Sequence, residues 1–211
     1  MTDEHGIVVT GRGSVASVPD TVVVTLGVSV HASTAPEAIG RAAQASGALM
    51  AALRTAGVAE SDVSTSHYGI HQEYRHTDAG STPDGYRVIN TVNAVVRDVG
   101  ETGSVIDAAA AAAGEAIEVQ GIVFGLSDDR AARAAAREAA FADAVAAATQ
   151  LAGLAGLPLG KASWIHEFQA FDGPGPGVMK ALAAGAATPV SGGELTTSVQ
   201  VEVRFEFAPR R

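Results

Sequence analysis

The chain has 211 residues, 47% of them hydrophobic and 18% charged, which is enough apolar material for one compact unit with a sizeable core. Its formal net charge of −9 repels phosphate backbones and anionic lipid, so neither nucleic-acid binding nor membrane insertion is expected. The absence of cysteine excludes disulfides, thiolate metal sites and a cysteine nucleophile.

The first segment imitates a nucleotide-binding fingerprint, because Gly11, Gly13 and Ala16 follow an apolar run with G-x-G-x-x-A spacing. Such a site needs a helix directly after the glycines, so that the amides of its first turn hold the pyrophosphate. Here a Pro-Asp turn and the alternating apolar residues of Thr21–Ala32 predict a second strand instead. We therefore expect a β-hairpin, with the two glycines at a bulge or kink, and no nucleotide cofactor.

The next elements are a helix and a hairpin. The Ala-rich stretch that begins after Ser33 and Thr34 predicts a helix ending at Gly57. Residues 62–75 and 86–96 predict two antiparallel strands, joined by the polar loop 77–85.

Two more Ala-rich segments predict helices. The shorter covers Glu101–Gly114 and precedes a strand within 118–128 whose two faces are both apolar, which indicates burial of both. The longer follows the capping residues Ser127, Asp128 and Asp129 and ends at about Ala155. Along it, Phe141, Val145, Ala148 and Ala152 recur at three- and four-residue spacing.

Two strands complete the chain. One covers Lys161–Phe171, and a Gly/Pro-bearing loop follows at about 172–193. In the last strand, Val199, Val201, Val203, Phe205 and Phe207 alternate with polar residues, which predicts one buried face. The order ββαββαβαββ indicates an α+β fold over a single domain, 1–211, with three Ala-rich helices packed on one face of an antiparallel, hairpin-rich sheet or sheets.

Six stretches along the chain form a recognisable set: "VTGRGSVASVPDTVVVTLGV", "TAPEAIGRAAQ", "GVAESDVSTSHYGIHQEY", "GYRVINTVNAVVRD", "VQGIVFGLSD" and "AREAAFADAVAAATQLAGLAGLPLG". Together, and in this order, they resemble the SIMPL domain family, also called DUF541, over nearly the whole chain. The resemblance implies an α+β fold, export of many bacterial members to the periplasm or envelope, links to stress tolerance, and self-assembly. It implies no catalytic residue, and the kinase association of one animal branch is not carried over to this chain.

The stretch "HYGIHQEYRH" is the most enzyme-like, because His67, His71 and Glu73 share a strand face with Gly69 and could offer ligands to zinc or iron. However, four strand positions separate the two histidines by ~13 Å, so chelation would need a bulge. A polar, solvent-facing strand is the favoured interpretation, and no metal or other cofactor is expected. A metal-dependent or hydrolytic enzyme that uses these three residues is the alternative.

The other charged candidates have structural interpretations. Asp128 and Asp129 precede a helix and are expected to cap it rather than form a catalytic pair. Arg130, Arg133 and Arg137 line one helical side and could bind an anion, but an ion-paired, solvated face is favoured. No G-x-S-x-G nucleophile motif occurs.

Self-association is predicted from two apolar features. The tip of the 172–193 loop carries Val178, Met179 and Leu182 with almost no charge, so it is expected to pack on a neighbouring subunit. Trp164, the only tryptophan, shares a strand face with His166 and Phe168 and would anchor a partner if it is exposed.

We therefore expect a non-enzymatic SIMPL-type domain that acts as a homo-oligomer or through an unknown protein partner, with a stress-related role implied by the resemblance. A small-ligand carrier with an apolar pocket between sheet and helices is a further alternative. The sequence predicts a cytoplasmic location if Met1 is the natural start, and a periplasmic or envelope location if a signal peptide has been removed.

Overall fold

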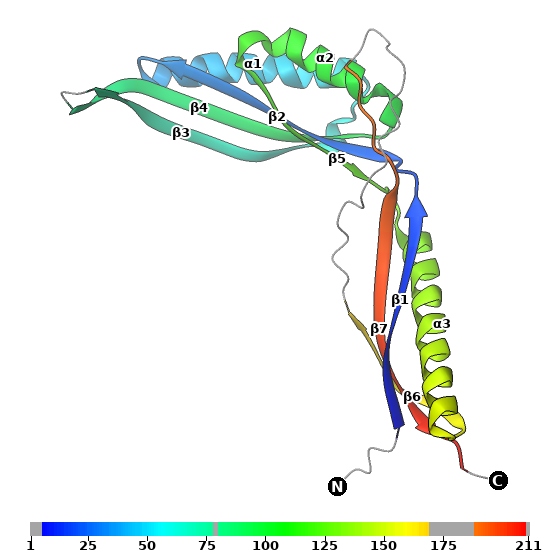
Figure 1. The fold of residues 1–211 in the computed structure, drawn as a ribbon. Helices are drawn as coiled ribbons and strands as arrows, with labels where there is room; N and C mark the ends of the chain where they lie inside the picture. The colour runs from blue at the N-terminus through cyan, green and yellow to red at the C-terminus, as the bar shows by residue number, and fades with distance from the viewer. Residues whose placement is uncertain (1–5, 78–79, 169–187, 210–211) are drawn as a thin grey trace. The chain divides into compact units, whose positions relative to one another are not determined.

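The computed structural model describes residues 6–77, 80–168 and 188–209. Its elements follow the predicted order ββαββαβαββ in two antiparallel sheets, which confirms the α+β fold class (Figure 1). Short 3₁₀ turns lie at Glu60–Asp62, Val99–Glu101 and Gly114–Ala116. The strands are β1 (Gly6–Ser17), β2 (Thr21–Ala32), β3 (Val63–Thr77), β4 (Gly80–Val96), β5 (Ile117–Gly125), β6 (Leu159–Phe168) and β7 (Leu195–Phe207), and the helices are α1 (Ala35–Thr55), α2 (Thr102–Ala113) and α3 (Arg130–Ala155).

The chain divides into two compact units, each with its own sheet and core. Among the described residues, the first unit holds 6–18, 127–168 and 193–209, and the second holds 19–126, apart from 78–79, and 188–192. The expectation of one domain over 1–211 stays a prediction, because contacts inside each unit do not test whether the two fold together.

The first unit packs α3 on one face of the sheet β1-β7-β6 (Figure 1). The predicted last strand is confirmed, since Val199, Val201, Val203 and Phe205 are buried against the helix. The helix presents small side chains at four-residue spacing, and Phe141 of the predicted stripe is 38% exposed. The buried residues of α3 are Ala136, Ala140, Ala144, Ala148 and Ala152.

Gly11 and Gly13 are the points where α3 approaches β1 most closely. A Cβ at Gly11 would lie 2.0 Å from the Ala140 carbonyl oxygen, and one at Gly13 would lie 2.2 Å from that of Ala136. The predicted bulge or kink is wrong, because β1 pairs with β7 without a register shift from Gly6 to Ser17 and neither glycine has positive φ. These glycines admit a helix backbone rather than bend the strand.

The predicted hairpin of β1 with β2 is also wrong. β1 pairs with β7 in the first unit, whereas β2 lies between β4 and β5 in the second. No helix follows β1, as expected, so the glycines do not form a dinucleotide-binding turn.

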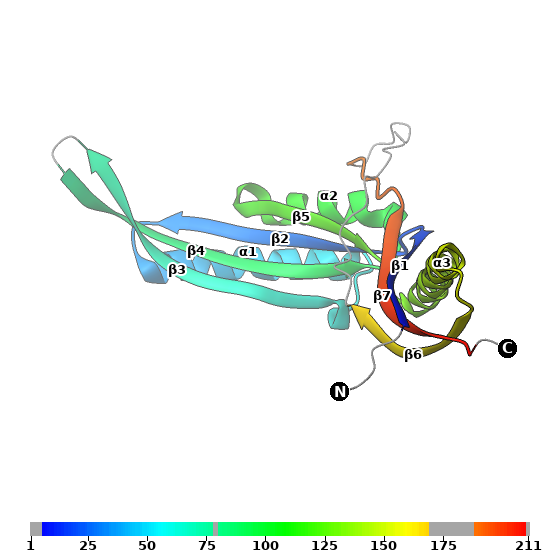
Figure 2. The same ribbon diagram turned by 60° about the horizontal axis from the view of Figure 1, so that its bottom comes forward.

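The second unit packs α1 and α2 on one face of the sheet β3-β4-β2-β5 (Figures 1 and 2). Alternate residues of the central strand β2 are fully buried beneath these helices, and Leu49, Leu53 and Val105 cover them from the helix side. The buried residues of β2 include Val22, Val24, Leu26 and Val28.

Three expectations about the second unit need correction. The three helices do not share one sheet, because α3 belongs to the first unit. The loop predicted at 77–85 is shorter, since pairing of β3 with β4 extends to Thr77 and Gly80. β5 is not buried on both faces: Val119 and Val123 are 47% and 64% exposed, because helices cover only one face of the sheet.

We predict that Gly11→Ala destabilises the first unit by about 1–3 kcal/mol, because its methyl group would meet backbone atoms of α3 that cannot rotate away. Urea unfolding followed by circular dichroism, which reports on both units, measures the loss in this variant and in its control. The matched control is Gly121→Ala on β5, where nothing lies within 4 Å of a new Cβ. It should stay within about 0.5 kcal/mol of the parent; equal losses would contradict the close helix approach.

Candidate functional site

The open face of the second unit's sheet carries the histidines of β3. The cross-strand neighbours of His67, Gly69 and His71 on β4 are Thr91, Ile89 and Arg87. These neighbours alternate along β4 with the helix-facing Val88, Val92 and Ala94, which are buried in the core. The histidines therefore lie on the sheet face that the helices leave uncovered.

The two imidazoles converge above Gly69. A Cβ at Gly69 would lie 2.9 Å from Nε2 of His67 and 2.9 Å from Nε2 of His71. Because each Nε2 atom lies at that distance from the same Cβ position, the two nitrogens are no more than about 6 Å apart. The ~13 Å expected from strand geometry applies to the backbone; the side chains lean toward each other without a bulge between them.

Glu73 lies on the same face but is bound elsewhere. Its carboxylate accepts hydrogen bonds from the Arg87 guanidinium, with Nη2 3.1 Å from Oε2, and His31 Nε2 lies 3.7 Å from Oε2. The contact with Arg87 holds the pKa of Glu73 below its ordinary value and raises the pKa of Arg87. The sequence did not predict that His31 and Arg87 lie beside Glu73. They are cross-strand partners on β2 and β4, and the sequence alone does not give the register that pairs them.

The predicted three-residue metal set is therefore not assembled as such. The side chains of His67 and His71 lie close together, whereas the Glu73 carboxylate binds Arg87. Across the described residues, no three His, Asp or Glu side chains form a group that would hold a metal ion. His76 lies further along β3, opposite Ser81.

The three arginines of α3 each have a carboxylate partner. Asp128 binds Arg130 and also accepts from its backbone N–H at 3.0 Å, whereas Asp129 binds Arg133 one helical turn on. Arg137 Nη2 donates to Glu167 of β6 at 2.9 Å, and this hydrogen bond lowers the pKa of Glu167. The cap on the helix comes from Asp128 rather than from Asp129, whose side chain makes no capping bond.

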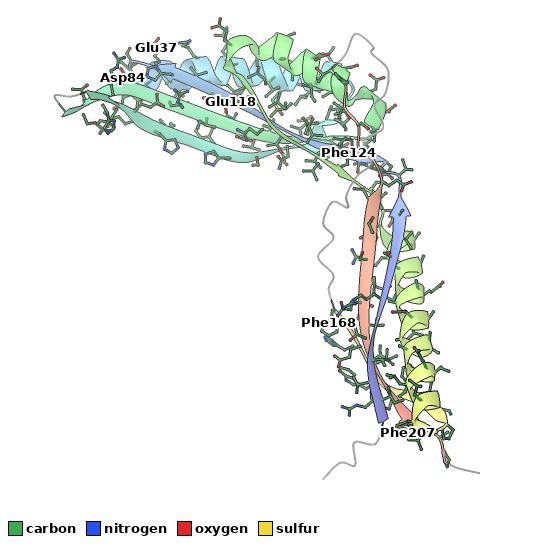
Figure 3. The ribbon with its side chains drawn as sticks, in the orientation of Figure 1. Glu37, Asp84, Glu118, Phe124, Phe168 and Phe207 are labelled. Carbon is green, nitrogen blue, oxygen red and sulfur yellow. The ribbon has the colours of Figure 1, made fainter. Side chains whose placement is uncertain are left out.

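The outer surface of β6 exposes an aromatic row. Trp164 and Phe168 of this row are 47% and 38% exposed. The Trp164 and His166 rings stack with centroids 5.7 Å apart, and His166 meets Phe168 edge-on at 4.7 Å. Figure 3 shows Phe168 on the side of β6 away from α3. The predicted association residues Val178, Met179 and Leu182 lie outside the described residues.

A hollow of about 540 Å³ lies in the second unit near the end of α1, and its wall includes Gly57, Val105 and the Asp62–Arg97 ion pair. This wall is partly charged, unlike the apolar pocket expected of a small-ligand carrier, so that alternative stays a prediction. Within residues 6–77, 80–168 and 188–209, no helix is long and apolar enough to cross a membrane.

Comparison with known proteins gives matches along nearly the whole chain. The model of the SIMPL family, described as "Protein of unknown function (DUF541)", matches residues 7–205. The "26 kDa periplasmic immunogenic protein" of Brucella melitensis biotype 1 is 30% identical over 222 residues, covering 98% of this chain and 86% of that protein. The "Uncharacterized protein YggE" of Escherichia coli K12 is 27% identical over 215 residues, covering 99% and 86%.

We predict that Glu73→Gln lowers the melting temperature at neutral pH and has no effect in acid. Folding lowers the pKa of Glu73 from its ordinary 4.5, so the ionised contact with Arg87 stabilises the fold above that value. The contribution disappears as the pH falls through the lowered folded-state pKa.

Melting curves of the parent and variant between about pH 7 and about pH 3 test this linkage. The control is Glu115→Gln, an exposed carboxylate in the same unit. A constant difference between the parent and Glu73→Gln at every pH would contradict the role of the ionised pair.

Proposed function

The chain belongs to the SIMPL (DUF541) family, and from that premise we propose that it is a non-enzymatic domain that acts by self-association through strand β6. The observation that carries this proposal is an aromatic row on an edge strand. The recognised family has no described function, so the proposal depends on the chain's own residues.

β6 is an edge strand, because the sheet order β1-β7-β6 leaves one of its sides without a strand among the described residues. Natural edges are commonly protected by charge, proline or bulges. The irregular pairing of β6 is confined to Leu159–Trp164, and its register with β7 is continuous from Trp164 to Phe168. The only charged residue of that regular part, Glu167, is neutralised by Arg137. The part of β6 that lacks these protections against pairing with another strand is thus residues 164–168, which carry the aromatic row.

The exposed side chains on this edge suit a protein interface. Tryptophan is enriched among residues that carry most of the binding energy, and aromatic side chains gain most when a partner removes them from water. Trp164 stacks on His166, which meets Phe168 edge-on, so the three rings form one preorganised row rather than scattered apolar residues. A second copy that pairs its own β6 would extend the sheet and place the two rows side by side on one face, where opposite side chains contact each other.

The enzyme alternative lacks an assembled set of reacting groups in the described part of the chain. Glu73 is bound to Arg87, and the two histidines have no third ligating carboxylate beside them. A stress-related role is implied by family resemblance alone and remains a prediction.

We also propose a periplasmic location, the second of the two locations that the sequence left open. The support is the name of the Brucella relatives, which calls those proteins periplasmic. Fractionation of the source cells should recover the protein with periplasmic markers; recovery with cytoplasmic markers would contradict this location.

We predict that Trp164→Glu lowers the molar mass in light scattering from that of an oligomer to that of a monomer. The charge would sit in the centre of the proposed interface, where a second copy would bury it unpaired. The fold should tolerate it at a cost of about 1–2 kcal/mol, because Trp164 is about half exposed and loses only its stacking on His166 and part of its buried area.

The matched control is Leu154→Glu, which places the same charge on an 80% exposed residue of α3 in the same unit. It should leave the mass unchanged. A parent protein that is a monomer at all concentrations would overturn self-association, and dissociation by both variants would move the interface away from β6.

A further inference from the structure

We propose that His67 and His71 bind one divalent late transition-metal ion on the open face of the second unit, and that Gly69 provides the space for it. This inference does not rest on the proposed function, because the site lies on a different sheet from β6. It assigns a binding site, without any reaction, to the pair of imidazoles that converge above Gly69.

The geometry of the imidazoles is close to what one ion requires. Metal–nitrogen distances for histidine are about 2.0–2.1 Å, so two ligands on one ion lie within about 4 Å of each other. The two Nε2 atoms are already within about 6 Å. Both side chains are exposed and, within the described part of the chain, neither makes a hydrogen bond or ion pair that would oppose a small rotation.

The ligand set selects the class of metal. Two imidazoles suit Cu²⁺, Ni²⁺ and Zn²⁺, whereas Mg²⁺ and Ca²⁺ need several oxygen ligands. The nearest carboxylate on this face, Glu73, is neutralised by Arg87 and does not complete an oxygen cage. The remaining positions on the ion would be filled by water, because the site faces solvent. Cu²⁺ is the strongest binder of these ions to nitrogen ligands and is therefore the best probe.

Gly69 makes the inference specific. A methyl group there would lie 2.9 Å from each Nε2 atom and would occupy the space between the imidazoles. Gly69 has no positive φ, so alanine fits its backbone conformation, and the strand should be preserved. Gly69→Ala therefore separates the two ligands while both remain in the protein.

The experiment is a titration of Cu²⁺ into the full-length, untagged protein, followed by calorimetry and by electron paramagnetic resonance. We expect one strong site per chain, with hyperfine splitting from two imidazole nitrogens. His67→Ala, His71→Ala and Gly69→Ala should each weaken this binding at least tenfold. His76→Ala, which removes an exposed histidine elsewhere on β3, should leave it unchanged.

Three results would overturn the proposal: no strong Cu²⁺ site in the parent protein, a site that survives both His67→Ala and His71→Ala, or a site that His76→Ala removes. Binding that survives Gly69→Ala while both histidine variants lose it would overturn the role of the glycine. Circular dichroism melts of each variant show whether a loss of binding reflects a loss of fold.

Discussion

The contact between the backbone of α3 and the glycines of β1 is the constraint on which the first unit depends. Every buried residue of α3 is alanine, so the helix can lie directly on the strand only where the strand also lacks side chains, at Gly11 and Gly13. This contact, together with β7, holds β1 in the first unit. β2 is consequently left to form the centre of the second sheet, between β4 and β5.

In each unit, helices cover only one face of the sheet, so candidate binding residues can lie on the other face. The helix-facing side of each sheet is filled by valine, leucine and alanine, and contributes stability rather than function. The opposite sides carry the aromatic row of β6 in one unit and the histidines with the Arg87–Glu73 pair in the other. Both candidate surfaces therefore follow from the same arrangement of one helical layer on one antiparallel sheet.

Missing side chains act in a similar way in both units, with different consequences. At Gly11 the absent Cβ admits a helix backbone, and at Gly69 it admits two imidazoles from the same strand. In the first case the space is filled by the fold itself, and in the second it opens to solvent. Gly11 and Gly69 thus mark close approaches, unlike Gly121 on β5, which has nothing within 4 Å of a new Cβ, and the approaching group decides whether such a glycine serves packing or binding.

The sequence by itself determined the order of elements, the α+β class and the buried face of β7, because these depend on local periodicity and turn residues. It also identified the family, through the resemblance of six stretches. Only the tertiary structure decided that β1 pairs with β7, whose partner residues lie 178 to 200 positions further along the chain, and that the helices divide between two sheets. Periodicity identifies a strand but not its partner. The same holds for the site. Alternation along the strand correctly predicted that His67, His71 and Glu73 share one face. Only the structure shows that the two imidazoles converge above Gly69 and that Glu73 binds Arg87 of β4.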